Sequence, residues 1–275
     1  LRKLIAKNRV KNIAIEGYTP SRTLAYFKKE LKSIWFHIVD NIIADVRAIK
    51  TKDEIKKTQH AQKLTDKLFR LITKQIKPNS TEKDITEKIN IWAIQNADGT
   101  SFDPIIAAGK HSAIPHHTPT NKKLPKNGPL LLDFGVRYKG YCADLTRTIW
   151  IGNKPSKKFQ SIYETVLQAQ DVALRACRFT STRAARDIDK VARHIIQTST
   201  FKDAFVHSTG HGVGLDIHEK PTISAASYDI LHGNEIITIE PGIYLKGNFG
   251  IRIEDIIVTG SGTNLTTAPK KLYTI

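Results

Sequence analysis

Four carboxylates stand in sequence settings that are unusual for acidic side chains. Each one ends or interrupts an apolar run: Asp133 in LLLDF, Asp144 in YCADLTRTIWI, Glu240 after IITI, and Glu254 in GIRIEDIIV. A lone carboxylate in apolar surroundings costs several kcal/mol unless a cation or a metal ion compensates its charge. These four residues therefore predict a metal site.

Their spacing predicts that the carboxylates meet in pairs. Asp133 and Asp144 are equidistant from a turn predicted at residues 138–139, and Glu240 and Glu254 are equidistant from the glycine of KGN. A hairpin that pivots at either turn sets two like charges directly opposite each other, with Cβ atoms about 4.5–5.5 Å apart. Such pairs repel unless a cation lies between them, which strengthens the prediction.

A glycine-rich segment, VHSTGHGVGLDIHEKP, adds His207, His211 and His218. The first two are spaced as on a helical zinc motif, but the glycines disfavour a helix and Ser208 stands where that motif needs Glu. We therefore expect an extended segment that brings one or more imidazoles to the carboxylates. Such a donor set suits Mn²⁺, Zn²⁺, Co²⁺ or Fe²⁺. Four carboxylates exceed the need of one ion, and two ions about 3.5–4 Å apart would perform hydrolysis.

Helices and hairpins alternate along residues 51–275. Capping residues and amphipathic spacing predict helices that begin at Thr51 and near Thr81, and two more over 155–176 and 183–198. Strands are predicted over 129–134, 141–151, 235–239 and 250–258. Because the pattern lacks the strand–helix–strand regularity of a doubly wound sheet, it favours an α+β fold with antiparallel pairs.

Residues 1–50 differ in character from the rest and hold one strand, one helix and one strand. The strands are predicted at 13–15 and 34–39, and the helix at 21–31. We interpret this region as a truncated N-terminal domain or a linker segment, and residues 51–275 as the catalytic domain.

The composition excludes two classes of protein. With 40% hydrophobic and 25% charged residues, the chain is too apolar to be disordered, and no run approaches the roughly 18 apolar residues of a spanning helix. Two cysteines cannot form a disulfide framework, and the basic N-terminus lacks the apolar run of a signal peptide. A cytoplasmic protein without a membrane partner is therefore expected.

The net charge of +17 suggests an alternative, because nucleic-acid binders are often this basic. However, the excess is spread thinly, and residues 201–275 hold six basic against eight acidic residues. We therefore interpret the basic residues as a solvated surface and do not expect a nucleic-acid partner.

The ordered set LLLDFG, ADLTRT, HSTGHGVGLDIHE, TIEPGIY and GIRIED resembles the pita-bread metallopeptidases, in the branch of aminopeptidase P and prolidase. The resemblance covers about residues 51–275. It implies a curved antiparallel sheet backed by two helix pairs, preceded here by a short remnant of an N-terminal α/β domain. It also implies a dinuclear site whose ligands are Asp133, Asp144, His211, Glu240 and Glu254, with the second and the last bridging the ions.

The same resemblance implies further site residues. Glu240 would also act as general base, and His116, in SAIPHH, would lie near the leaving side of the scissile bond. His207 and His218 would line the proline pocket and stabilise the tetrahedral intermediate. Arg252 marks the Xaa-Pro branch, and with His116 and His207 it would contact substrate.

The implied activity is metal-dependent hydrolysis of the Xaa-Pro bond at the N-terminus of short peptides, by an Xaa-Pro aminopeptidase or dipeptidase. Two divalent ions are expected, manganese first, with zinc, cobalt or iron as alternatives. A homodimer is the assembly considered. The alternative function is a non-catalytic pita-bread module that binds nucleic acid or protein partners through its basic surface.

Overall fold

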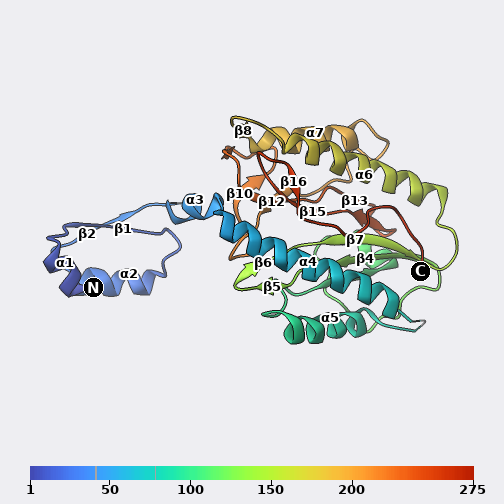
Figure 1. Cartoon of the computed structure of the whole chain (residues 1–275), viewed down its shortest axis with the longest axis horizontal. Coiled ribbons are helices and arrows are strands. Elements are labelled where there is room, and N and C mark those ends of the chain that lie inside the picture. The colour runs from blue at the N-terminus through green and yellow to red at the C-terminus, as the bar shows by residue number, and fades with distance from the viewer. Residues whose placement is uncertain (41, 78) are drawn as a thin grey trace. The chain divides into compact units, whose positions relative to one another are not determined.

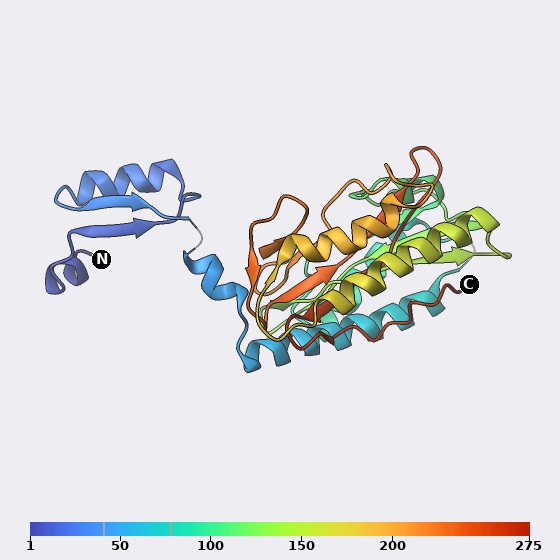
Figure 2. The same ribbon diagram turned by 90° about the horizontal axis from the view of Figure 1, so that it is seen from above.

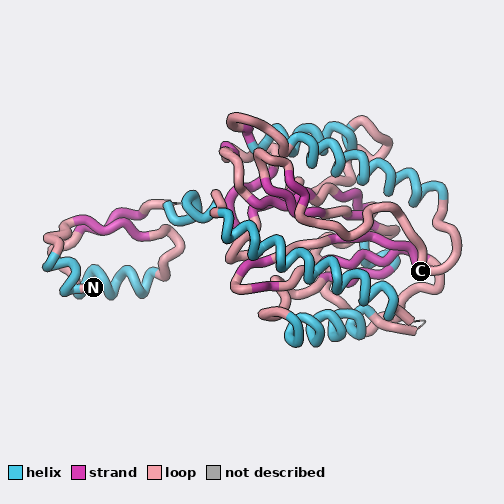
Figure 3. The backbone as a smooth tube through the Cα atoms, viewed as in Figure 1, coloured by secondary structure: helices cyan, strands magenta, loops and turns pink. Residues whose placement is uncertain are grey.

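The computed structural model describes residues 1–40, 42–77 and 79–275 (Figures 1, 2 and 3). The chain divides into two compact units, Leu1–Arg47 and Ala48–Ile275. The sequence places a boundary slightly later, after residue 50. In the described ranges, no helix is both long enough and apolar enough to cross a bilayer.

The N-terminal unit is built on two parallel strands. β1 (Asn12–Ile15) pairs with β2 (Trp35–Ile38), and α2 (Ser21–Glu30) connects them. These elements confirm the predicted strand, helix and strand. A parallel pair needs such a crossover, because a short turn cannot reverse the chain direction twice. Two short helices, α1 (Arg2–Lys7) and α3 (Ile42–Ala48), were not predicted.

The C-terminal unit packs four long helices against antiparallel strands (Figures 1 and 3). The helices are α4 (Lys52–Gln75), α5 (Glu82–Asn96), α6 (Lys157–Ala176) and α7 (Ala185–Gln197), together with the 3₁₀ turn η1 (Gly109–Ala113). The strands are β3 (Ile105–Ala108), β4 (Gly128–Asp133), β5 (Arg137–Tyr138), β6 (Tyr141–Cys142), β7 (Thr146–Ile151), β8 (Arg183–Ala184), β9 (Gly210–Gly212), β10 (Glu219–Ile223), β11 (Ile230–Leu231), β12 (Ile236–Ile239), β13 (Gly242–Tyr244), β14 (Gly250–Arg252), β15 (Asp255–Val258) and β16 (Thr263–Asn264). The predicted α+β class and all four helices are confirmed.

Capping boxes begin two of the helices, as predicted. The Thr51 side chain accepts from the backbone N–H of Glu54, whose carboxylate accepts from the backbone N–H of Thr51. Thr81 and Asp84 make the same exchange at the start of α5. These bonds satisfy N–H groups that have no partner within the helix, so the two starts are encoded locally.

Each helix pair covers a different part of the strands. Apolar side chains of α4 and α5 share one core cluster with the three-stranded sheet β3–β4–β7. Side chains of α6 pack with β7, β13 and β14, and α6 and α7 together pack with β12 and β15. Figure 2 shows α6 and α7 running side by side. The strand hairpins are therefore held by helices from both halves of the unit.

The first hairpin differs from its predicted register. Asp133 pairs with Thr146 rather than with Asp144. The turn is formed by Lys139 and Gly140, whose φ angles of 48° and 81° give the two-residue turn that best matches strand twist. The predicted turn, one residue earlier, is therefore wrong. Because alternate residues share a face, Asp144 still faces the same side as Thr146 and lies diagonal to Asp133.

The second hairpin has the predicted register. β12 pairs with β15, and β13 pairs with β14, in one register whose midpoint is Gly247. Gly247 has a φ of 75°, a left-handed conformation that glycine adopts at no steric cost. The predicted pivot is confirmed, and this register sets Glu240 opposite Glu254.

Leu132→Ala should lower the free energy of unfolding by about 2–5 kcal/mol, because Leu132 is fully buried in β4 and its truncation leaves a cavity. Urea denaturation followed by circular dichroism measures the change. Ile94→Ala on α5 is the control: this side chain is 74% exposed, and the change should stay within about 0.5 kcal/mol. Equal effects of the two substitutions would contradict the packing described here.

Candidate functional site

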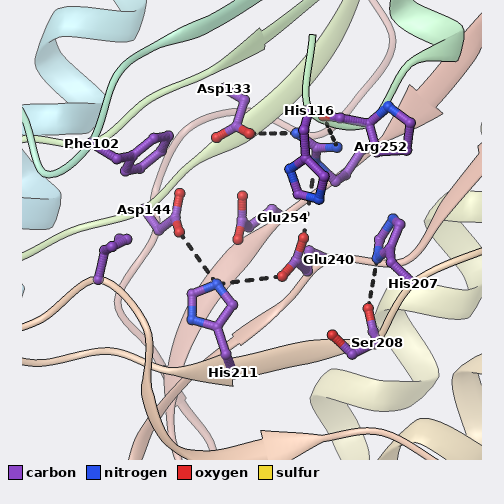
Figure 4. A pocket seen from close by; sticks show the side chains of 12 residues that line it. Phe102, His116, Asp133, Asp144, His207, Ser208, His211, Glu240, Arg252 and Glu254 are labelled. Atoms are coloured by element: carbon purple, nitrogen blue, oxygen red, sulfur yellow. Dashed lines mark hydrogen bonds and ion pairs between the residues drawn. The ribbon is translucent and has the colours of Figure 1, made fainter. Parts of the chain in front are cut away.

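A cavity of about 120 Å³ lies where the two hairpins meet the glycine-rich segment (Figure 4). Eight of the predicted site residues line it: His116, Asp133, Asp144, His207, His211, Glu240, Arg252 and Glu254. The ninth, His218, is not among the lining residues, but its ring centroid lies 4.3 Å from that of His211. The structure therefore brings together side chains that are up to 138 positions apart in the chain, from His116 to Glu254.

The four carboxylates come from the points where strands end or begin. Asp133 is the last residue of β4 and Asp144 precedes β7, whereas Glu240 follows β12 and Glu254 precedes β15. Asp133, Asp144 and Glu254 are buried. At these positions the strand ladders are interrupted, so the side chains converge on the space between the hairpins (Figure 4).

Burial and mutual repulsion make these carboxylates resist ionisation. Burial raises the pKa of Asp144 well above its ordinary value, and the charges of Asp133 and Glu240 raise it further. Burial also raises the pKa of Glu254 well above the usual range, with Asp144 and Glu240 adding to the effect. For Glu240, burial raises the pKa to about 7 against the opposing charge of Arg252. Bound cations would relieve both causes.

His211 is oriented as a metal ligand. Its Nδ1 lies 3.0 Å from the carbonyl oxygen of Gly212, and because a carbonyl can only accept, Nδ1 carries the hydrogen. The lone pair of Nε2 then points at Asp144 and Glu240, whose nearest oxygens are 3.7 and 3.5 Å away. Burial lowers the pKa of His211 to about 4, so the ring is neutral near pH 7.

The donor atoms fit divalent cations. Asp144, His211 and Glu254 each offer one ligand atom, and these three atoms lie within 4.8 Å of one another. Oδ1 of Asp133 and Oδ1 of Asp144 are buried, and neither has a hydrogen-bond partner in the part of the chain that the structure describes. Buried oxygens without a donor are costly, and metal coordination would satisfy them.

The glycines beside His211 explain how this segment reaches the carboxylates. It forms the short strand β9, as the glycines predict, and pairs with β10 and β12. A Cβ on Gly210 would lie 2.0 Å from the Thr238 carbonyl oxygen, and one on Gly212 would lie 2.1 Å from that of Lys220. Only residues without a side chain permit this close backbone approach.

Arg252 compensates and orients part of the acidic cluster. Its guanidinium donates to Asp133 from Nη2, to Thr146 Oγ1 from Nε at 3.1 Å, and to the Tyr244 hydroxyl from Nη1 at 2.8 Å. Thr146 in turn donates to Glu254 at 2.6 Å. One planar cation therefore holds two carboxylates in place, directly and through a hydroxyl.

The same network continues to His207. Since the Tyr244 hydroxyl accepts from Arg252, it donates to Nε2 of His207 at 2.8 Å, and Nδ1 of that ring donates to the Ser208 carbonyl at 2.7 Å. Both ring nitrogens are engaged, and burial lowers the pKa of His207 to about 3. His207 therefore presents a neutral ring to the cavity rather than a free acid or base.

His116 reaches the cavity from a different direction, in the loop that follows η1. Figure 4 shows its ring next to the Arg252 side chain. The preceding carbonyl, of Pro115, accepts from Arg252 Nη1 at 3.3 Å, which ties this loop to the cluster.

Several cavity residues were not foreseen from the sequence. Phe102, Pro115, Ser208 and Ile217 also line the cavity. Thr146 does not line the cavity but bonds Arg252 and Glu254, and it could have been found because it stands two residues after Asp144 on the same strand face. The others carry no comparable local signal.

Comparisons with known proteins agree with this geometry. Residues 56–261 match the sequence profile of metallopeptidase family M24. The Xaa-Pro dipeptidase of Pyrococcus furiosus is 36% identical over 269 residues, which cover 97% of this chain and 76% of that protein.

Solved structures of two such enzymes superpose closely on this chain. The Xaa-Pro dipeptidase from Bacillus anthracis has a TM-score of 0.93 at 33% identity, covering 99% of this chain and 77% of its own. The X-Pro aminopeptidase from Thermotoga maritima has a TM-score of 0.91 at 33% identity, covering 100% and 78%. Both specificities are thus represented among its structural neighbours.

In protein stripped of metal by a chelator, Glu240→Gln should increase the free energy of unfolding at pH 8. The folded-state pKa of Glu240 is raised from 4.5 to about 7, so the folded protein loses stability as the pH rises from 4.5 through 7. Glutamine does not ionise, so the substitution should raise the free energy of unfolding above that of the parent by up to about 3 kcal/mol at pH 8. At pH 4.5 the two proteins should be equally stable.

Urea denaturation at pH 8 and pH 4.5 measures this difference. Glu164→Gln, at an exposed position of α6, is the matched control and should show no such pH dependence. A metal-free Glu240→Gln protein less stable than the parent at pH 8 would contradict the burial described here.

Proposed function

The chain belongs to metallopeptidase family M24, and on that premise we propose that it hydrolyses the Xaa-Pro bond at the N-terminus of short peptides. The observation that carries this proposal is the convergence of four carboxylates and His211 on one cavity. The Xaa-Pro specificity is supported by the dipeptidases and the aminopeptidase that the chain resembles over most of its length.

We assign two divalent ions to this cavity, with Asp133, Asp144, His211, Glu240 and Glu254 as ligands. The unpartnered aspartate oxygens, the neutral His211 and the raised pKa values of the carboxylates support the assignment. A carboxylate-rich set favours Mn²⁺, with Zn²⁺, Co²⁺ and Fe²⁺ as alternatives. When bound, such a pair supplies a water of lowered pKa and polarises a carbonyl oxygen.

Glu240 is the proposed general base. Its carboxylate accepts from Thr238 Oγ1 at 3.3 Å, which holds it in the cavity 3.5 Å from His211 Nε2. It takes a proton from the attacking water, and it returns that proton to the proline nitrogen as the C–N bond breaks.

Histidines and Arg252 form the proposed substrate contacts. His116, in the loop after η1, would contact the leaving side of the peptide, and His218 would donate to the carbonyl oxygen of the scissile bond. His207, whose nitrogens are engaged, contributes a ring wall to the proline pocket. Proline has no amide N–H, so a pocket of matching shape selects it rather than a hydrogen bond to the backbone.

The non-catalytic module is not favoured. It would have no use for the clustered carboxylates of this cavity, where ionisation of Asp144 and Glu254 destabilises the fold unless cations bind. The charge of +17 is its main support, and a solvated surface explains that charge equally well.

We also propose the cytoplasm as the compartment, supported by Cys142 and Cys177, which are both buried and unpaired. A homodimer is the proposed assembly, and light scattering of the purified chain tests it.

Turnover of Ala-Pro and Ala-Pro-Ala, with metal content measured on the same sample, tests the function. We expect Mn²⁺-dependent cleavage of the Xaa-Pro bond, and a decrease of kcat by about 10²–10⁴ in Glu240→Gln. Cleavage of the dipeptide alone indicates a dipeptidase, and cleavage of both indicates an aminopeptidase.

Glu164→Gln, on the exposed face of α6, is the matched control and should retain full activity. A metal-loaded chain that cleaves neither peptide, but binds RNA with a steep salt dependence, would support the non-catalytic module instead.

Arg252→Lys should lower kcat/KM for the cleaved peptide by about 10–100-fold, because a point charge cannot bond Asp133, Thr146 and Tyr244 together. Arg175→Lys, in an exposed ion pair on α6, is the control and should be neutral. Unchanged kcat/KM in Arg252→Lys would refute the orienting role of this guanidinium.

A further inference from the structure

A second group of metal-ligating side chains lies apart from the residues assigned above. It consists of Glu82 in the first turn of α5, His111 in η1, and His117 in the loop that follows. Each offers one ligand atom, and the three atoms lie within 4.8 Å of one another. None of the three lines the candidate active-site cavity.

Both imidazoles aim a nitrogen at the same carboxylate. Nδ1 of His111 lies 2.8 Å from Oε1 of Glu82, and Nε2 of His117 lies 3.0 Å from Oε2. The two ring centroids are 4.3 Å apart, so the rings lie next to each other. The carboxylate has no exposed surface, whereas the His111 side chain is 19% exposed.

The carboxylate is held by donors other than the histidines. Its Oε1 accepts from the backbone N–H of Ala108 at 2.9 Å, and its Oε2 accepts from the N–H and the hydroxyl of Thr120 at 2.9 and 2.8 Å. Although burial opposes ionisation, the bonds from His117, Ala108 and Thr120 lower the pKa of Glu82 to about 2. Metal-binding carboxylates are typically held by such outer donors.

In the part of the chain that the structure describes, no lysine or arginine pairs with Glu82. Its ion-pair partners there are the two histidines. A fully buried carboxylate is stabilised further by a nearby cation, and a metal ion held by the two imidazoles would supply one here.

We propose that Glu82, His111 and His117 bind a divalent cation of the zinc class, separate from the dinuclear centre. Two imidazoles and one carboxylate form a common donor set for Zn²⁺, with a fourth position left for water. Ligands about 2.1 Å from one ion lie about 3.0–3.4 Å from each other, so the observed nitrogen–oxygen distances of 2.8 and 3.0 Å need to open by about 0.6 Å at most.

A cation bound here would link the two ends of the loop that carries His116. His111 and His117 flank that residue in the chain, and Glu82 holds both ends of the loop to α5. Since the Pro115 carbonyl in the same loop accepts from Arg252, the bound ion would restrain the loop against the catalytic cluster. The cation therefore has a structural role.

Shape-matched variants separate ligation from hydrogen bonding. Asparagine at 111 and glutamine at 117 each present an amide N–H near the position of the ring nitrogen, so donation to Glu82 persists while the imidazole ligands are lost. The variants are made in an Asp144→Asn/Glu254→Gln background, which weakens the dinuclear centre and makes the result independent of peptidase activity.

Zinc content after desalting and the visible spectrum of bound Co²⁺ are the readouts. We expect the background protein to retain about one Zn²⁺ per chain more than the His111→Asn/His117→Gln version, and to bind Co²⁺ at least about tenfold more tightly. Zn²⁺ should also raise the Tm of the background protein, but not the Tm of its His111→Asn/His117→Gln version. Equal zinc content and equal Tm responses would overturn the proposal.

Three further variants serve as controls for this comparison. His232→Asn changes an exposed histidine and should leave the zinc content unaltered; a loss there equal to that of the double variant would overturn the assignment. The single variants His111→Asn and His117→Gln, with folding checked by circular dichroism, provide the same test if the double variant does not fold.

Discussion

Four carboxylates that face one another in one cavity repel, and the burial of their side chains removes most of the water that would otherwise screen them. The rise in the pKa values of Asp144, Glu240 and Glu254 has these two causes. Arg252 supplies only one positive charge against four acids, and His211 is neutral. Ionisation of these carboxylates therefore lowers the free energy of unfolding unless divalent cations bind. The Oδ1 atoms of Asp133 and Asp144, which lack a hydrogen-bond partner among the described residues, also indicate that positive charge is missing here.

The strand arrangement makes this crowding sterically feasible. Each acid stands at a strand end, where ladder pairing is interrupted and the side chains can turn into the space between the hairpins. Helix pairs packed on both halves of the unit hold the two hairpins, so the acids cannot separate to relieve their repulsion. The chain of bonds from Arg252 through Tyr244 to His207 then joins the acidic cluster to the wall of the cavity. The packing that stabilises the two hairpins therefore also keeps the repelling carboxylates close together.

Local rules explain which sequence predictions succeeded. The capping boxes at Thr51 and Thr81 involve neighbouring residues, so both helix starts were readable. The hairpin around Gly247 was predicted in register because its glycine occupies the turn. The turn of the preceding hairpin was predicted one residue too early. Lys139 adopts a left-handed conformation there, which its residue type does not indicate. Alternation along the strand kept Asp144 on the correct face despite that error.

The sequence by itself determined the donor types, their order and the elements that carry them, because periodicity, caps and turns act over a few residues. Only the tertiary structure decided that Phe102 and Ile217 line the cavity and that both nitrogens of His207 are engaged. It also decided that Glu82 meets two histidines 29 and 35 positions away. Such contacts depend on how helices and loops pack together, and packing between distant segments leaves no periodic trace in the chain.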